Sequence, residues 1–372
     1  MSKNISYFAS ESVCAGHPDK VCDGISDAIL DAVLASDPNG RVAVEALVAD
    51  NHIVLAGEVT TTAQVNFEEI ARNKIKQLGY INNDWGFSFE SKLDNFIHQQ
   101  SPEIAVGVDA EGAGDQGMMF GFACNETKEL MPTPITIAHR LTQKIDSIRE
   151  SGELPFLRPD GKAQVVVGYE DDKPKFVSHV TIAVPHSEDV TSEQIFEDVY
   201  TKIISPVLAE FNYSVNRDQA IVNGTGIWNI PGPSSDCGLT GRKIVVDSYG
   251  GFARVGGGAF SGKDPSKVDR SGAYAARYIA KNIVASKLAS KVEVGLAYYI
   301  GAKKPVMLNI DTFGTELASL ESIYEFVDNL INSSVSGIIK QLDLRKPIYS
   351  NTSAYGHFGK SNLPWEQIVN VK

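Results

Sequence analysis

The strongest chemical signal in the sequence is the glycine-rich segment GGGAFSGK at 256–263. Glycines let backbone amides approach an anion closely, and Lys263 adds a full positive charge, so the pattern is typical of phosphate binding. We expect a long helix to follow directly, with Asp264 as its cap, Pro265 in its first turn, and Lys267 on a face next to Lys263. A flexible turn is the alternative. Asp264 stands where a P-loop NTPase needs Ser or Thr for Mg²⁺, which excludes an ordinary P-loop.

A second signal is GHPDK at 16–20, which places an imidazole, a carboxylate and an ammonium at the start of a predicted helix. Asp19 can ligate Mg²⁺, and His17 can donate a hydrogen bond to a phosphate oxygen. A capped helix start without chemistry is the alternative, because Asp is common at that position.

The charge distribution points to a small anionic ligand. The chain has 34 Lys and Arg against 46 Asp and Glu, a formal net charge of −12, which opposes binding to nucleic acid or to an anionic membrane. The stretch from Arg242 to Arg270 is an exception, because its basic side chains outnumber its acidic ones.

Several carboxylates occupy positions that need an explanation. Glu45 and Glu58 each lie among apolar residues of a predicted strand, where a carboxylate requires either a solvated face or a cation. Asp115, Asp160 and Asp236 lie in turn-forming surroundings. Such loops often carry function, although a plain surface turn is the default alternative.

These residues must be positioned by alternating strands and helices, a pattern that predicts mixed α/β layers. The expected elements are a helix over 20–35, strands over 41–48 and 53–60, a helix from Asn66 to Gly79, a helix ending near Gly152, strands over 163–169 and 177–184, a helix near 193–210, strands over 243–247 and 292–299, and helices near 318–331 and 334–343.

The 372 residues are enough for two or three domains. Boundaries are expected at the loop 100–112 and at the Gly/Pro-rich stretch 223–233, which gives domains over 1–101, 112–230 and 231–372. There is no apolar run long enough to cross a membrane and no secretory signal. The four cysteines are scattered and are expected to be free thiols, so a cytoplasmic location is predicted.

These segments, in this order and over nearly the whole chain, resemble the S-adenosylmethionine synthetases. The resemblance is carried by GHPDK, by the two signature segments GAGDQG and GGGAFSGKDPSKVDR, and by the longer matches LMPTPITIAHRL at 130–141 and DCGLTGRKIVVDSYGG at 236–251. The family fold it implies is α/β (α+β), with three similar, intertwined two-layer domains of mixed sheet and helices. The reaction it implies is attack by the sulfur of L-methionine on the 5′ carbon of ATP, with triphosphate released and then hydrolysed to pyrophosphate and phosphate.

The resemblance also implies roles for individual residues. It places His17, Lys162, Arg242, Lys243 and Lys263 around the triphosphate as the catalytic groups, Asp160, Ile227, Trp228, Asp236 and Ala259 near the nucleotide, Glu58, Gln100, Asp115, Asp236 and Lys267 on the methionine side, Asp19 and Asp269 as Mg²⁺ ligands, and Glu45 at a K⁺ site. Two Mg²⁺ per site, K⁺, and a homodimer with shared active sites that pairs into a homotetramer are expected.

The sequence departs from the family pattern at four positions, Gly224, Ile227, Pro231 and Val255, and its 100–112 loop is short. The departures are expected near the adenosine end of the site. Two other functions are considered beside the transferase: a phosphohydrolase or kinase that turns over ATP without methionine, and a nucleotide-sensing subunit that binds without reacting.

Overall fold

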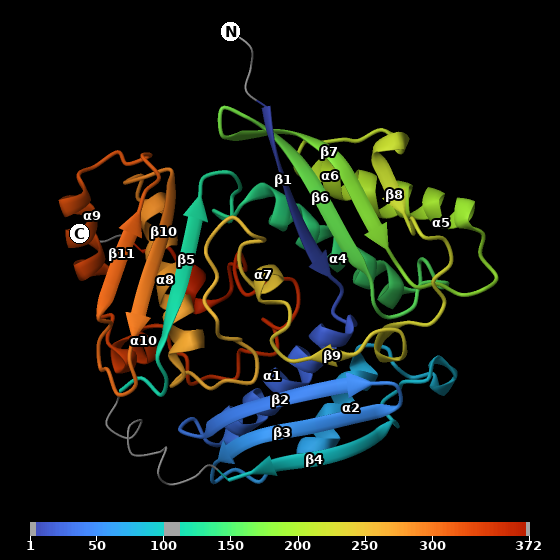
Figure 1. Ribbon diagram of the computed structural model, residues 1–372, viewed down its shortest axis with the longest axis horizontal. Coiled ribbons are helices and arrows are strands. Elements are labelled where there is room, and N and C mark those ends of the chain that lie inside the picture. Colours follow the sequence, from blue (N-terminus) through green and yellow to red (C-terminus); the bar gives the residue numbers. More distant parts are fainter. Residues whose placement is uncertain (1–4, 100–111, 370–372) are drawn as a thin grey trace.

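Three β-sheets, each with helices packed on it, make up the described part of the chain (Figure 1). The structure is a computed structural model that describes residues 5–99 and 112–369. Within these residues, no helix combines the length and the apolar character needed to cross a membrane.

The first sheet has the strand order β4-β3-β2-β9 and carries helices α1 and α2 on one face. Its elements are α1 (Pro18–Ser36), β2 (Arg41–Ala49), β3 (His52–Thr60), α2 (Phe67–Gln77), β4 (Lys92–His98) and β9 (Gly238–Leu239). Val21, Ile25, Ile29 and Val33 of α1 are fully buried against the sheet, as their four-residue spacing predicts.

The second sheet has the order β1-β6-β7-β8 and packs on α4. Its elements are β1 (Ile5–Val13), α4 (Thr133–Ser151), β6 (Lys162–Glu170), β7 (Lys173–Ala183), α5 (Ser192–Val199), α6 (Ser205–Glu210) and β8 (Ala220–Val222). The helix expected near 193–210 is interrupted by a π-helical turn, Tyr200–Ile204. Pro206 follows in the first turn of α6, and its missing N–H prevents regular α-helical bonding there.

The third sheet has the order β11-β10-β5 and packs on α8. Its elements are β5 (Gly117–Cys124), α8 (Val268–Ala285), β10 (Lys291–Tyr298), β11 (Met307–Asp311), α9 (Leu320–Leu330) and α10 (Val335–Gln341). The short helix α7 (Ile244–Asp247) contacts β1 of the second sheet. Short 3₁₀ turns lie at Asn83–Trp85, Arg217–Gln219, Gly232–Ser234 and Pro364–Glu366.

Each sheet takes a strand from a distant part of the chain. β1 pairs with β6, β5 pairs with β10, and β9 pairs with β2. The prediction of intertwined α/β units is therefore confirmed. The linear limits 1–101, 112–230 and 231–372 stay a prediction, because these three strands join sheets outside their own segments.

Local sequence signals account for the element ends. Asn66 caps α2 by accepting from the amide of Glu69, and Gly152 ends α4 with a φ of 75°. The hairpin of β2 and β3 turns at Asp50-Asn51, where Asn51 has a φ of 50°. Asn tolerates this left-handed conformation better than most residues.

The predicted strand at 243–247 is wrong, because Ile244–Asp247 is a short α-helix, α7. The β-branched residues favour a strand locally, but ion pairs to α1 override that preference. Lys243 and Asp247 lie four residues apart on one helical face, where Lys243 meets Asp19 and Asp247 meets Lys20 of α1.

The predicted start of the long helix is also wrong. Helix α8 begins at Val268 with Lys267 as its N-cap residue, so Asp264 does not cap it. Asp264 is drawn instead to the edge of β2, where its carboxylate accepts from the amide of Val42 at 2.8 Å. Lys263 consequently lies before the helix and not in its first turn.

Candidate functional site

The GHPDK segment forms a buried start to α1. The imidazole Nδ1 of His17 accepts from the backbone amide of Asp19 at 3.2 Å. The other ring nitrogen, Nε2, is buried and has no hydrogen-bond partner among the described residues. Burial, followed by the nearby Lys243 and Lys162 ammonium groups, lowers the pKa of His17 from 6.5 to about 3.

These contacts fix the protonation state of the ring. A neutral imidazole whose Nδ1 accepts a hydrogen bond carries its proton on Nε2. His17 is therefore a buried hydrogen-bond donor that is available to a ligand.

Asp19 contacts the segment that carries Arg242 and Lys243. Its carboxylate accepts from Lys243 Nζ at 2.5 Å and from the backbone amide of Leu239 at 3.0 Å. The guanidinium Nε of Arg242 lies 3.7 Å from the same carboxylate, and the Arg242 side chain is about half exposed. We call His17, Asp19, Arg242 and Lys243 the α1 cluster.

The segment 160–162 adjoins the α1 cluster. Asp160 is buried, and its two oxygens accept from the amides of Gly161 and Gly232. Burial raises the pKa of Asp160 to about 7, against the opposing effect of these two hydrogen bonds. Lys162 is exposed at the start of β6 and influences the pKa of His17, so it lies near the α1 cluster.

A second cluster forms around the glycine-rich segment. Lys263 Nζ pairs with Asp269 of α8 at 2.6 Å, and Lys267 pairs with the buried Asp264. A Cβ at Gly258 would lie 2.1 Å from the carboxylate carbon of Asp269, so a side chain there would displace that carboxylate. We call Lys263, Asp264, Lys267 and Asp269 the α8 cluster.

The two clusters lie along the same edge of β2. Leu239 pairs with Leu47, and Lys263 bridges to Ala43, so the backbones that carry the clusters are four strand residues apart, about 13 Å. Within residues 5–99 and 112–369, no hydrogen bond or ion pair joins the two clusters. The residues expected around the triphosphate therefore lie in two separate sets within one chain: His17, Arg242 and Lys243 in the α1 cluster, and Lys263 in the α8 cluster.

A row of aspartates on α1 holds both sets, and the sequence reasoning missed it. Asp23 accepts from the amide of Gly241, Asp27 from Gly262, and Asp31 from Ser350. With Asp19 these residues recur every four positions and share one helix face. That spacing beside the apolar stripe of α1 was the available signal.

Asp27 is the centre of this row. It forms a bidentate ion pair with Arg270 at 2.7 and 2.9 Å, and both side chains are fully buried. Arg270 also donates to the carbonyl of Lys263. The amide of Gly262 is thus committed to Asp27 and is not free for a phosphate, contrary to the simple expectation for a glycine-rich loop.

The comparisons with known proteins agree with the order of these motifs. Three family models match consecutive parts of the chain: the N-terminal domain of S-adenosylmethionine synthetase over 5–102, its central domain over 110–228, and its C-terminal domain over 230–367. The chain belongs to the S-adenosylmethionine synthetase family.

Similar curated proteins carry the same name. S-adenosylmethionine synthases of Clostridium tetani, Sulfurovum sp. and Treponema denticola are 49%, 50% and 48% identical to the chain. The alignments cover 97%, 98% and 99% of this chain and 96%, 96% and 97% of the relatives. Membership of the S-adenosylmethionine synthetases confirms the predicted enzyme class, methionine adenosyltransferase, whose members use ATP, methionine and metal ions.

Three other residues that the S-adenosylmethionine synthetase pattern implies, Glu45, Glu58 and Asp115, belong to neither cluster. Glu45 and Glu58 share the outward face of the first sheet, where Glu58 lies 3.7 Å from His98 Nε2. Asp115 and Asp236 are exposed. Asp236 lies near the α1 cluster, because its charge, after the larger effect of Asp19, contributes to raising the pKa of Arg242. Gln100 lies outside the described residues.

The residues implied for the nucleotide lie on two segments. Ile227 is 76% exposed, and the indole of Trp228 donates to the carbonyl of Ile230. Ala259 packs against Gly241, which connects the glycine-rich segment to the turn before Arg242. The four departures from the family pattern do not gather within one chain: Val255 lines a small pocket with Asp269, whereas Gly224, Ile227 and Pro231 lie on the 223–232 segment.

Proposed function

We propose that this chain synthesises S-adenosylmethionine from ATP and L-methionine, and that the α1 and α8 clusters together hold the triphosphate. The observation that carries the proposal is the buried Nε2–H of His17, which has no partner among the described residues and lies near the ammonium groups of Lys243 and Lys162. Such a donor needs an anionic acceptor, since leaving it unpaired in the interior costs free energy.

The reaction requires alignment and charge neutralisation. The methionine sulfur forms a bond to C5′ of ATP while the C5′–O bond breaks, and the triphosphate leaves with the electron pair. A thioether is already a nucleophile, so the protein needs no activated Ser or Cys. Lys162, Arg242, Lys243 and Lys263 neutralise the charge that collects on the leaving group, and His17 donates to one of its oxygens. Hydrolysis of the triphosphate to pyrophosphate and phosphate then precedes product release.

Asp19 and Asp269 fit two Mg²⁺ ions that are held mainly by phosphate oxygens. Each is a single carboxylate beside a lysine, and within the described residues there is no group of three or more His, Cys, Asp or Glu that could hold a metal. Mg²⁺ commonly takes one or two carboxylates together with substrate phosphates. When bound, Mg²⁺ supplies additional positive charge to the phosphates.

Glu45 fits a K⁺ site on a surface that a second protomer covers in the proposed homodimer. It is exposed on β2, in one cross-strand row with Ala56 and Phe96. Phe96 is 64% exposed and Leu47, next but one to Glu45, is 39% exposed. A carboxylate buried on so apolar a face requires a cation.

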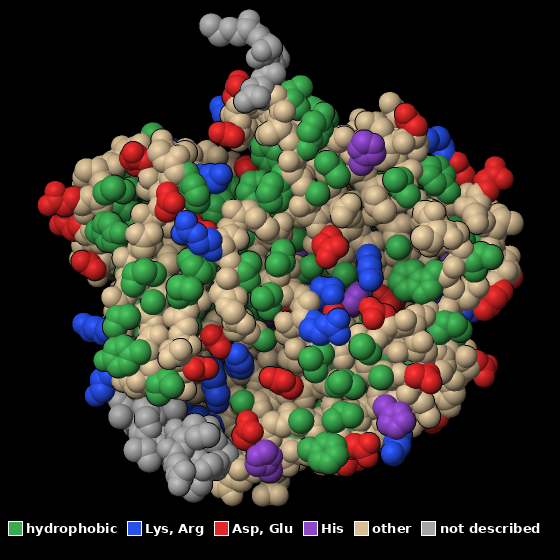
Figure 2. Space-filling model, in the orientation of Figure 1, with side chains coloured by type: hydrophobic (Ala, Val, Ile, Leu, Met, Phe, Trp, Pro, Cys, Tyr) green, Lys and Arg blue, Asp and Glu red, His purple; other side chains and the backbone are tan. Residues whose placement is uncertain are grey.

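The same face supports a homodimer with shared active sites, two of which form a tetramer. Apolar side chains lie at the surface over β2, β3 and β4 (Figure 2), and they include Leu47 and Phe96. Exposed apolar side chains on one sheet face are typical of a protein contact. In such a dimer the α1 cluster of one protomer and the α8 cluster of its partner hold one triphosphate. Asp160, Ile227, Trp228, Asp236 and Ala259 then contact the nucleotide, and Glu58, Gln100, Asp115, Asp236 and Lys267 the methionine side.

Product identification tests the reaction. The protein is incubated with ATP, methionine, Mg²⁺ and K⁺, and the sulfonium product is sought by mass spectrometry. ATP turnover that does not depend on methionine would replace the proposal by a phosphohydrolase or kinase. ATP binding without any turnover would replace it by a nucleotide-sensing subunit.

A complementation experiment tests the shared site. Lys243→Ala and Lys263→Ala chains are co-expressed, each inactive alone. If one site takes its clusters from two protomers, half of the random dimers are mixed and one of their two sites is intact, so activity returns to about a quarter of wild type. No recovery in verified mixed dimers would place both clusters in a site of one chain.

A further inference from the structure

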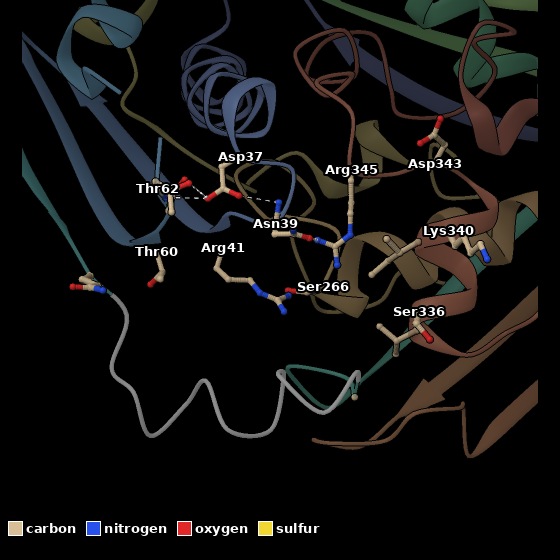
Figure 3. A pocket seen from close by; sticks show the side chains of 15 residues that line it. Asp37, Asn39, Arg41, Thr60, Thr62, Ser266, Ser336, Lys340, Asp343 and Arg345 are labelled. Carbon is tan, nitrogen blue, oxygen red and sulfur yellow. Dashed lines mark hydrogen bonds between the residues drawn. The ribbon is translucent and has the colours of Figure 1, made fainter. Parts of the chain in front are cut away.

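A cavity of about 1090 Å³ lies between the Arg41 end of β2 and helix α10, and the proposed reaction makes no use of it (Figure 3). Its described lining includes Arg41, Ser266, Lys340 and Arg345. It includes none of Lys263, Lys267 and Asp269. The cavity therefore adjoins the α8 cluster without sharing its functional side chains.

Two polar groups on its wall lack satisfactory hydrogen-bond partners among residues 5–99 and 112–369. The hydroxyl of Ser266 is buried without a hydrogen-bond partner among the described residues, and Ser266 is only 5% exposed. In the described part of the chain, the carboxylate that lies within ion-pair distance of Arg41 is that of Asp264, at 3.9 Å. That distance is too long for a hydrogen bond, and Asp264 already accepts from Val42, Ser266 and Lys267.

Arg345 brings a second guanidinium to the same place. In Figure 3, Arg41 extends from β2 and Arg345 from the segment after α10, and both line the cavity together with Ser266. One nitrogen of Arg345, Nη1, donates to the carbonyl of Pro38 and to Asn39 Oδ1, at 3.0 and 2.5 Å. Within the described chain, the other nitrogens of its guanidinium have no hydrogen-bond partner.

The acidic residues of the lining do not neutralise these cations. Asp37 accepts hydrogen bonds from Asn39, Thr61 and Thr62, which hold its carboxylate in the turn after α1. Asp343 pairs with Lys346, which is not among the lining residues. Lys340 adds a third positive charge at the α10 wall.

We propose that this cavity binds the phosphate group of a small organic phosphate, separately from the triphosphate site. Two guanidinium forks and a hydroxyl supply donors in more directions than the two oxygens of a carboxylate can accept, whereas a tetrahedral oxyanion has oxygens for all of them. The cavity is much larger than one phosphate, so it leaves room for an organic part beside Lys340.

The experiment uses the full-length protein and two probes, selenate and inorganic phosphate. Crystals are soaked in selenate, whose anomalous scattering locates the ion, and phosphate binding is measured in solution by calorimetry with the triphosphate site filled by a non-hydrolysable ATP analogue. We expect an anomalous peak between Arg41, Ser266 and Arg345. Arg345→Gln and Arg41→Gln should each remove the peak and weaken phosphate binding about tenfold or more.

Arg217→Gln is the matched control, because it makes the same change at an exposed arginine that pairs with Glu197 in a different part of the fold. It should leave the peak and the affinity unchanged. Sulfonium formation by Arg345→Gln without added phosphate should equal that of wild type, which separates this site from the proposed reaction. The absence of a peak, a peak that survives both substitutions, or binding at crystal concentration only would overturn the proposal.

Discussion

Replacing Asp27 by Asn tests the buried ion pair that connects α1 to the α8 cluster. The carboxylate of Asp27 accepts hydrogen bonds from both terminal nitrogens of Arg270, the amide of Gly262, and the hydroxyls of Ser261 and Thr352. An amide keeps the shape but turns one acceptor into a donor that faces these groups. It also leaves the guanidinium of Arg270 buried without a counter-charge.

The magnitude follows from the burial of the pair. Breaking a fully buried ion pair by removing one partner costs about 3–5 kcal/mol. A chain of 372 residues has an unfolding entropy of about 0.8 kcal/mol/K. The expected fall in Tm is therefore about 4–6 °C if the chain unfolds in one transition.

Differential scanning calorimetry measures this change, with Glu197→Gln as the control. Glu197 and Arg217 also form an ion pair, but both side chains are about half exposed, so the control should cost less than about 1 kcal/mol, or roughly 1 °C. Turnover of Asp27→Asn should also fall below that of the control, since Asp27 and Arg270 fix the backbone of Gly262 and Lys263. A Tm for Asp27→Asn no lower than that of Glu197→Gln would refute the reasoning.

Three other changes have defined outcomes. Lys263→Ala should lower turnover about 10²–10³-fold in steady-state assays while Tm changes little, because its side chain is partly exposed; unchanged turnover in the folded variant would remove Lys263 from the site. Cys237→Ala should have a comparatively mild effect on turnover, since its exposed thiol makes only a 3.9 Å contact with Arg242, and a loss as large as that of Lys263→Ala would show that the thiol matters. The pKa of His17 is lowered to about 3, so the stability gained from burying the neutral ring is complete above the unfolded-state pKa of about 6.5 and is lost as the pH falls toward 3. NMR of His17 should show no titration between pH 5 and 8. A titration midpoint near 6.5 would contradict the burial argument.

The sequence predicted the elements whose signals are local. The four-residue spacing on α1, the Asn66 cap and the hairpin turn at Asn51 depend on neighbours in the chain, and the structure has all three. The family, the fold class and the enzyme class followed from long motifs, and the family models confirm them.

The errors arose where distant residues decide the local structure. Ile244–Asp247 has strand-forming residues, but its helix brings Lys243 and Asp247 to partners on α1 more than 200 residues earlier. Asp264 has a typical capping sequence, but its carboxylate accepts a hydrogen bond from the amide of Val42 instead of capping α8. Neither partner can be read from the segment itself.

The division of the candidate site into two clusters was likewise outside the reach of the sequence. Lys243 and Lys263 are only 20 positions apart and were placed in one basic island, yet they pair with different helices. The separation is set by where Leu239 and Lys263 meet β2, a matter of sheet register.

The exchanged strands have a consequence for synthesis on the ribosome. β1 emerges first, but its partner β6 follows about 150 residues later, which takes roughly 8–30 s at ordinary translation rates. β2 waits still longer for β9. Early segments therefore present unpaired strand edges to chaperones and to neighbouring nascent chains, and only release of the last third allows all three sheets to close.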